Sequence, residues 1–171
     1  MTVIYWYARS NNTSGSGIDT GIILTQTAIE RLAYEYTVND KKMIEQNGFK
    51  NDLKASDKFR LLFANLDIPL TIPPNLLKIQ VVAKKLKHID SPHFLTELRN
   101  AMVHPGHKKH KEFNGLYFDA WRLGMWYLEL AILNLCNYEC TYTNRLQDGR
   151  MVGQVEDVPW KKNEAILDSQ V

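Results

Sequence analysis

An arginine, an asparagine and a histidine stand close together near the middle of the 171-residue chain, as Arg99, Asn100 and His104. Arginine carries a permanent charge on a planar fork that suits phosphate oxygens, asparagine adds an amide donor, and histidine moves a proton near neutral pH. RNA cleavage by its own 2′-hydroxyl needs a base, an acid for the leaving 5′-oxygen, and cations for the phosphorane charge. These residue types therefore point to chemistry on a phosphodiester.

The relative positions of these side chains depend on how their helix ends. The Ser91-Pro92 pair is a helix-start signal, and the apolar spacing that follows predicts a helix over residues 91–103. On an ideal helix Arg99 and His104 would lie roughly 140° apart. Because a proline disfavours helical backbone at the residue before it, Pro105 should take His104 out of the helix. We expect His104 then to converge with Arg99 and Asn100 on one rim.

The chemistry also makes a prediction about assembly. One histidine does not easily serve as both base and acid in one turnover. Two copies of the motif facing each other across a two-fold axis would supply two histidines and two arginines. We therefore expect a homodimer with the site at its interface.

An R-N-x-x-x-H run at the end of an amphipathic helix resembles the signature of the HEPN superfamily, whose active members are metal-independent ribonucleases. Other stretches are similar to the C-terminal HEPN domain of ApeA-type anti-phage proteins: GIILTQTAIE at 21–30, WRLGMWYLE at 121–129, NYECTYTNR at 137–145 and VEDVPW at 155–160. The similarity covers most of residues 1–160.

The resemblance implies an all-helical bundle that dimerises through its motif helices and cleaves RNA to block phage propagation. It implies Arg99, Asn100 and His104 as the site. ApeA-type proteins also carry a large N-terminal domain that this chain lacks, so any regulatory step stays open. We expect residues 1–160 to form one HEPN-like domain, either part of a longer protein or starting naturally at Met1, and residues 161–171 to be a polar tail.

The helical pattern agrees with an all-α fold. Apolar residues at helical spacing predict further helices over 18–38, 56–66, 76–86 and 117–138. The last of these is apolar on nearly every side, which is typical of a central, buried helix. Residues 40–55 are predicted to be a loop, and residues 139–160 to be irregular or a short hairpin around Asp148-Gly149.

Composition limits the class of protein. Hydrophobic residues make up 44% and charged residues 23%, which is typical of a soluble globular domain. The net charge of +2 is too mild to indicate nucleic-acid binding, so RNA affinity must come from local clusters. Two cysteines and no secretory leader favour a cytoplasmic protein. The most apolar stretch, 125–135, is shorter than a bilayer span and contains Glu129, so we expect no membrane segment.

Basic residues outside the motif are candidates for RNA contact. Lys108, Lys109 and Lys111 directly follow the motif and would grip phosphates, or they form an ordinary solvated loop. Arg145 lies where a phosphate could dock, or it fixes the C-terminal segment. Glu129, an acid within the most apolar helix, needs a partner and would support the site by holding Arg99 or Arg122; otherwise it occupies an exposed edge.

Metal and cofactor chemistry is not indicated. His104, His107 and His110 recur at every third residue, but a Pro-Gly pair interrupts them and the flanking lysines would repel a cation. Cys136 and Cys140 are expected to be buried free thiols, and His88 and His93 to cover a surface. A glycine-rich phosphate loop and a G-x-S-x-G elbow are both absent from the sequence, which argues against nucleotide hydrolases and serine esterases.

Two other functions stay open at this point. The same fold would serve as a non-catalytic module that binds RNA or a partner protein through a residual motif. Alternatively, the chain would be a growth-arresting toxin that is paired with an antitoxin. Expression alone distinguishes the toxin, since it should then arrest cells.

Overall fold

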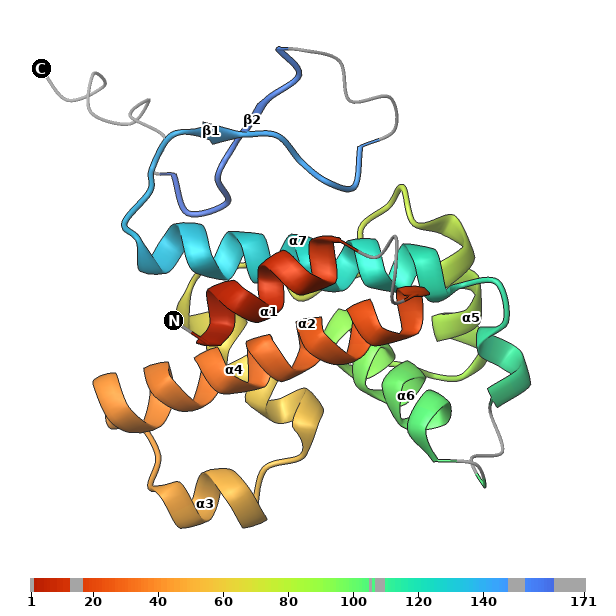
Figure 1. Cartoon of the computed structure of the whole chain (residues 1–171), viewed down its shortest axis with the longest axis horizontal. Helices are drawn as coiled ribbons and strands as arrows, with labels where there is room; N and C mark the ends of the chain where they lie inside the picture. The colour runs from red at the N-terminus through yellow and green to blue at the C-terminus, as the bar shows by residue number, and fades with distance from the viewer. Residues whose placement is uncertain (1, 13–16, 105, 107–109, 148–152, 162–171) are drawn as a thin grey trace, which may run out of the picture.

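The computed structural model describes the chain except residues 1, 13–16, 105, 107–109, 148–152 and 162–171. The described residues are mostly helical, which confirms the all-α prediction (Figure 1). The α-helices are α1 (Thr2–Asn11), α2 (Gly17–Tyr34), α3 (Gln46–Asn51), α4 (Ala55–Asn65), α5 (Leu77–Lys85), α6 (Ser91–Val103) and α7 (Tyr117–Leu135). A π-helical turn, η2 (Glu35–Asp40), continues α2, and a 3-10 turn, η3 (His110–Phe113), precedes α7.

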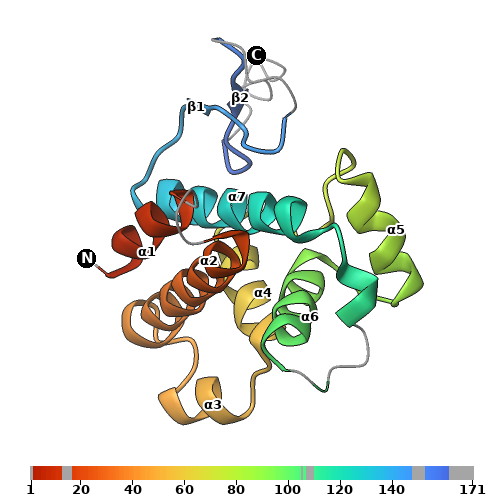
Figure 2. The ribbon, with the colours of Figure 1, turned by 45° about the vertical axis from the view of Figure 1, so that its right-hand side comes forward.

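Helix α7 lies between the C-terminal segment and helices α2, α4 and α6, and nine of its 19 residues are buried, as its apolar sequence predicts (Figure 2). Helices α1 and α2 lie against one side of it, and α4 and α6 pack beneath α2 (Figure 1). Tyr127 of α7 is fully buried, stacks on Phe63 with ring centroids 4.3 Å apart, and donates a hydrogen bond to the Pro69 carbonyl (2.7 Å). Burial raises the pKa of Tyr127 far above its usual range. A neutral, hydrogen-bonded phenol thus occupies the middle of the core.

Helices α1, α2 and α7 meet at small residues. The Ser10 hydroxyl donates to the Gly21 carbonyl (2.8 Å) and lies 2.6 Å from the Thr25 hydroxyl, and the Trp121 indole N–H donates to Ser10. A Cβ at Gly124 would lie only 3.1 Å from the Thr25 methyl, so glycine permits this close approach of α2 and α7. The junction fixes α1 to the rest of the bundle.

Helix α6, which carries the motif, has the bounds predicted from the sequence, but a different residue caps it. The Asp90 carboxylate accepts from the His93 backbone N–H (2.9 Å), whereas Ser91 is already the first helical residue. Asp90 also receives two hydrogen bonds from Arg60 of α4, at 2.5 and 3.0 Å. The aspartate therefore both caps α6 and ties it to α4.

Replacing Asp90 by alanine should lower the free energy of unfolding by about 2 kcal/mol, because the helix loses its cap and Arg60 loses its partner. Asp90→Asn keeps a capping oxygen and should cost less. Urea unfolding of the two variants measures both effects. Equal stability of Asp90→Ala and the parent chain would contradict this role.

The segment between η2 and α4 differs from the predicted loop. Residues 46–51 form α3, whose Phe49 is 3% exposed and contacts Tyr34 edge to face at 5.4 Å. The next helix begins at Ala55, so Ser56 lies buried in its first turn instead of capping it. A single buried aromatic residue thus stabilises a short helix in an otherwise polar stretch.

The C-terminal segment lies on the side of α7 away from α6 (Figure 2). Strands β1 (Thr141–Tyr142) and β2 (Glu156–Asp157) pair antiparallel, in agreement with the predicted hairpin, whose turn lies outside the described residues. Helix α7 ends at Leu135 and not 138, because Asn137 adopts a left-handed conformation (φ 55°). Consequently Cys136 and Cys140 are exposed and not buried as expected.

The predicted polar tail, 161–171, lies almost wholly outside the described residues, and its separation from a 1–160 domain stays a prediction. Among the described helices, none combines the length and apolar character needed to cross a membrane.

Candidate active site

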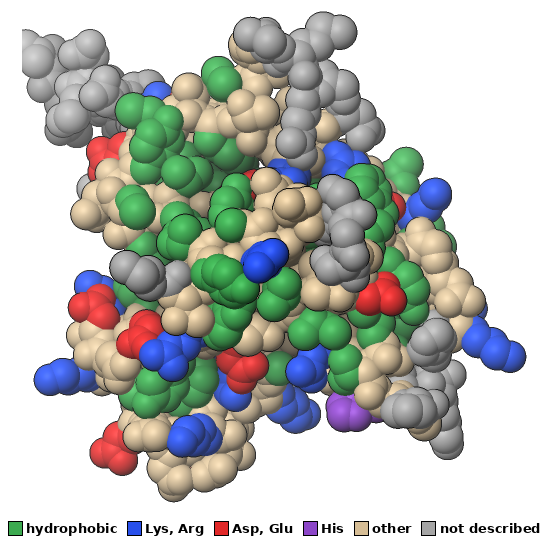
Figure 3. Space-filling view, in the orientation of Figure 1, with side chains coloured by type: hydrophobic (Ala, Val, Ile, Leu, Met, Phe, Trp, Pro, Cys, Tyr) green, Lys and Arg blue, Asp and Glu red, His purple; other side chains and the backbone are tan. Residues whose placement is uncertain are grey.

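The three motif residues occupy the C-terminal end of α6. Arg99 and Asn100 are half-buried in its last turns, and His104 is the C-cap, with φ −111° and ψ 104° and an exposed side chain. The His104 backbone N–H still donates to the Asn100 carbonyl (3.0 Å). The predicted departure of His104 from helical geometry is confirmed. In the orientation of Figure 1, a histidine side chain is exposed at the lower right of the surface, where α6 ends (Figure 3).

Arg99 and Asn100 share a small pocket of about 30 Å³ with Thr96. The other lining residues come from α2 and α4: Gln26, Thr27, Glu30, Ala55 and Phe59. His104 does not line this pocket; it lies at the C-terminal end of the helix. The structure thus brings Arg99 and Asn100 onto one rim, with His104 one turn further on.

The charges around Arg99 and Asn100 favour the binding of an anion. Glu30, the acidic residue of the pocket, accepts from the Lys58 ammonium at 2.7 Å and is already paired. Within the described part of the chain, the side chains of Arg99, Asn100 and His104 form no hydrogen bond or ion pair. The arginine charge, the amide and the imidazole are therefore available to a ligand.

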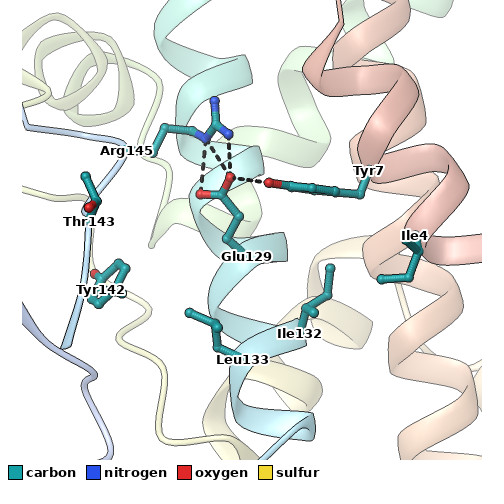
Figure 4. A pocket seen from close by; sticks show the side chains of 8 residues that line it. All are labelled: Ile4, Tyr7, Glu129, Ile132, Leu133, Tyr142, Thr143 and Arg145. Carbon is teal, nitrogen blue, oxygen red and sulfur yellow. Dashed lines mark hydrogen bonds and ion pairs between the residues drawn. The ribbon is translucent and has the colours of Figure 1, made fainter. Parts of the chain in front are cut away.

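Glu129 does not support this rim, which corrects the expectation that it holds Arg99 or Arg122. Its carboxylate forms an ion pair with Arg145, whose Nε lies 3.0 and 3.1 Å from the two oxygens, and accepts from the Tyr7 hydroxyl at 3.0 Å (Figure 4). Arg122 instead donates to the Arg145 carbonyl (3.1 Å). The acid within the apolar helix is satisfied by the C-terminal segment.

Arg145 is buried and paired with Glu129, and contact of this residue with RNA stays a prediction. It is 8% exposed and also donates to the Asn11 side chain (2.9 Å). Burial opposes its charge, but the hydrogen bonds and charge of Glu129 outweigh burial and raise the pKa of Arg145. The alternative prediction, that Arg145 fixes the C-terminal segment, is confirmed by its hydrogen bonds to Glu129 and Asn11.

A larger pocket of about 350 Å³ lies next to this ion pair, between α1, α7 and the C-terminal segment (Figure 4). It is lined by Ile4, Tyr7, Glu129, Ile132, Leu133, Tyr142, Thr143 and Arg145. Burial, followed by the negative charge of Glu129, raises the pKa of Tyr7. The sequence does not predict this pocket, because its walls come from segments more than 120 residues apart.

The basic stretch after the motif is only partly described. Lys111 is exposed, whereas Lys108, Lys109 and His107 lie outside the described residues. RNA contact by these lysines stays a prediction. Among the described residues, a different group has metal-ligating spacing: His88, His93 and Glu97, near the start of α6.

Comparison with known proteins gives the family. The family model of the YopA C-terminal domain matches residues 1–157. The chain is also 34% identical over 160 residues to the SPbeta prophage-derived uncharacterized protein YopA of Bacillus subtilis (strain 168). That alignment covers 93% of this chain and 35% of the relative, so the chain spans about a third of the relative's length. No solved structure matches. The chain belongs to the YopA C-terminal domain family.

Proposed function

We propose that this domain is a metal-independent endoribonuclease of the HEPN type. The observation that carries the proposal is the set of available groups at one helix end: Arg99 and Asn100 on a common rim, and His104 exposed immediately beyond it. A guanidinium, an amide and an imidazole match the needs of phosphodiester cleavage. The all-helical fold and the sequence resemblance support the same function.

In the proposed reaction, the RNA 2′-oxygen attacks the adjacent phosphorus and the bond from phosphorus to the 5′-oxygen breaks. One imidazole removes the 2′-hydroxyl proton, and a second group protonates the leaving 5′-oxygen. Arg99 neutralises the charge that develops on the non-bridging oxygens, and Asn100 donates a hydrogen bond to them. The products are a 2′,3′-cyclic phosphate and a 5′-hydroxyl.

The second proton-transfer group comes, in this proposal, from His104 of a second copy. The 30 Å³ pocket beside Arg99 is far smaller than the roughly 300–1,000 Å³ of pockets that enclose small ligands. Because RNA does not fit inside this pocket, it would lie across the surface at Arg99 and Asn100, and a second protomer would complete the site. Because a two-fold axis duplicates the motif, the homodimer carries two histidines and two arginines at one composite site.

The proposed activity also has a consequence for how the protein is controlled in the cell. An unregulated ribonuclease would be toxic in the cytoplasm, so a regulatory domain or an antitoxin is expected to control it. The chain corresponds to 35% of its prophage-derived relative, which leaves room there for such a domain. Growth arrest during phage infection would then be the cellular outcome.

Purified protein is expected to cleave single-stranded RNA in the presence of excess EDTA. Neither Arg99 nor His104 needs a metal-bound water to act, so removing divalent ions should leave the rate within about twofold. End analysis of the fragments should show 2′,3′-cyclic phosphate and 5′-hydroxyl groups.

Two outcomes would contradict the proposal. Loss of cleavage in EDTA would show that the activity depends on a metal ion. RNA binding without any cleavage would favour the non-catalytic binding module.

A further inference from the structure

Two imidazoles and a carboxylate gather at the start of α6, on the part of the helix opposite the motif end. His93 and Glu97 are four residues apart on α6 and share one face of it. His88 comes from the connection between α5 and α6. One ligand atom from each of the three side chains lies within 4.8 Å of the other two.

The backbone around His88 explains how it reaches α6. Lys87 adopts a left-handed conformation (φ 57°), and the His88 N–H donates to the Ala83 carbonyl at 2.8 Å, which closes the end of α5. The turn directs the His88 ring toward the His93 ring, with centroids 4.8 Å apart. His88 also stacks on Phe113 at 6.0 Å and is 9% exposed. Packing thus holds this imidazole in place.

The second imidazole is oriented by the backbone. The Ile89 N–H donates to His93 Nδ1 at 3.2 Å, so in the neutral ring Nδ1 holds the lone pair, which a metal ion would take in place of this hydrogen bond, and Nε2 carries the proton. Glu97 is half-buried, and its long side chain adjusts by rotation. His88 is therefore held by packing, whereas His93 and Glu97 have to change their contacts to bind an ion.

The chemistry of the three ligands favours zinc. Two imidazoles with one carboxylate form a common three-ligand Zn²⁺ set, whereas Mg²⁺ and Ca²⁺ prefer oxygen ligands alone. Ligand atoms around a tetrahedral zinc ion lie about 3.4 Å apart, given bonds of about 2.0–2.2 Å. A separation of at most 4.8 Å therefore needs only a side-chain adjustment of roughly 1 Å.

We propose that His88, His93 and Glu97 bind one Zn²⁺ ion, with water at the fourth position. The ion would join the α5–α6 connection to the helix that carries Arg99, two residues beyond Glu97. Because packing already positions His88, the ion would stabilise the start of α6 by linking it to this residue. The proposed RNA chemistry does not involve the ion. Removal by EDTA would loosen the start of α6 without removing any reacting group.

The test uses the untagged chain, stripped with chelator and titrated with ZnCl₂ by calorimetry, with Co²⁺ absorption as a second readout. We expect one Zn²⁺ per chain, a rise in Tm, and a Co²⁺ spectrum typical of tetrahedral nitrogen and oxygen ligands. Glu97→Gln and His93→Ala should each weaken Zn²⁺ binding at least about tenfold. MgCl₂ should leave Tm unchanged.

His104→Ala is the matched control, because it removes a histidine from the opposite end of the same helix without touching the three ligands. Its Zn²⁺ affinity should equal that of the parent chain. The proposal is overturned if the parent chain binds no Zn²⁺ at micromolar concentration. It is also overturned if a His93→Ala/Glu97→Gln double variant binds as tightly as the parent, or if His104→Ala abolishes binding.

Discussion

His104→Ala should lower the rate of RNA cleavage by about a hundredfold or more, because the site loses the group that moves protons. Arg99→Ala should cause a loss of similar size, since the developing phosphorane charge is no longer neutralised. Both side chains lack partners within the described chain, so neither change removes a contact that the fold needs. Single-turnover cleavage of a labelled RNA measures the effect, and circular dichroism verifies the fold.

Lys111→Ala provides the matched control for this experiment, because it removes an exposed charge close to the motif and no reacting group. It should weaken RNA binding and reduce its salt dependence while the rate at saturating RNA stays unchanged. Parent-level cleavage by the Arg99→Ala/His104→Ala double variant, in a preparation free of other nucleases, would refute the proposed site.

Mixing experiments examine whether the site is shared between two copies. Random pairing with a ninefold excess of His104→Ala should reduce the activity of the parent chain to about a tenth, because nearly all parent protomers then have an inactive partner. A site contained within one protomer would keep its full activity in the mixture. That second result would leave the ribonuclease proposal standing and remove the composite site.

Arg145→Ala should lower the free energy of unfolding by about 3 kcal/mol, the second large effect that we expect. The Glu129 side chain is only 19% exposed, and its remaining partner would be the neutral Tyr7 hydroxyl. Breaking such an ion pair leaves a poorly hydrated carboxylate among apolar neighbours, which costs more than the pair itself contributes. Urea unfolding followed by tryptophan fluorescence measures this loss.

Arg31→Ala is the comparison, since Arg31 pairs with Glu35 one turn along the helix and both side chains are well exposed. Exposed pairs of this kind contribute only about 0.3–0.5 kcal/mol. Converting Glu129 as well, in a Glu129→Gln/Arg145→Ala double variant, should recover part of the lost stability. A loss for Arg145→Ala no larger than that for Arg31→Ala would show that the buried ion pair is not structurally important.

The sequence predicts best where local signals determine the outcome. The bounds of α6 follow from Pro92 in its first turn and from Pro105 after its end, and the extended backbone of His104 follows from Pro105. The central position of α7 follows from its apolar surface. These features need no knowledge of distant residues.

The sequence predicts least where distant segments meet. The partner of Glu129 was missed because Arg145 reaches it only after the chain turns back along α7. Helix α3 was missed because its stability depends on Phe49 meeting Tyr34. The histidine and glutamate cluster at the start of α6 was missed because His88 is brought to it by the unusual backbone of Lys87.

The bond between Tyr7 and Glu129 has a consequence for the dynamics of the domain. One carboxylate joins the first helix to Arg145, so α1 and the C-terminal segment share this anchor. Neither segment can detach without uncovering the same charge, and such segments open as one cooperative unit. Amide hydrogens of α1 and of the segment around Arg145 would therefore exchange with solvent at matched rates, well separated from those of α7.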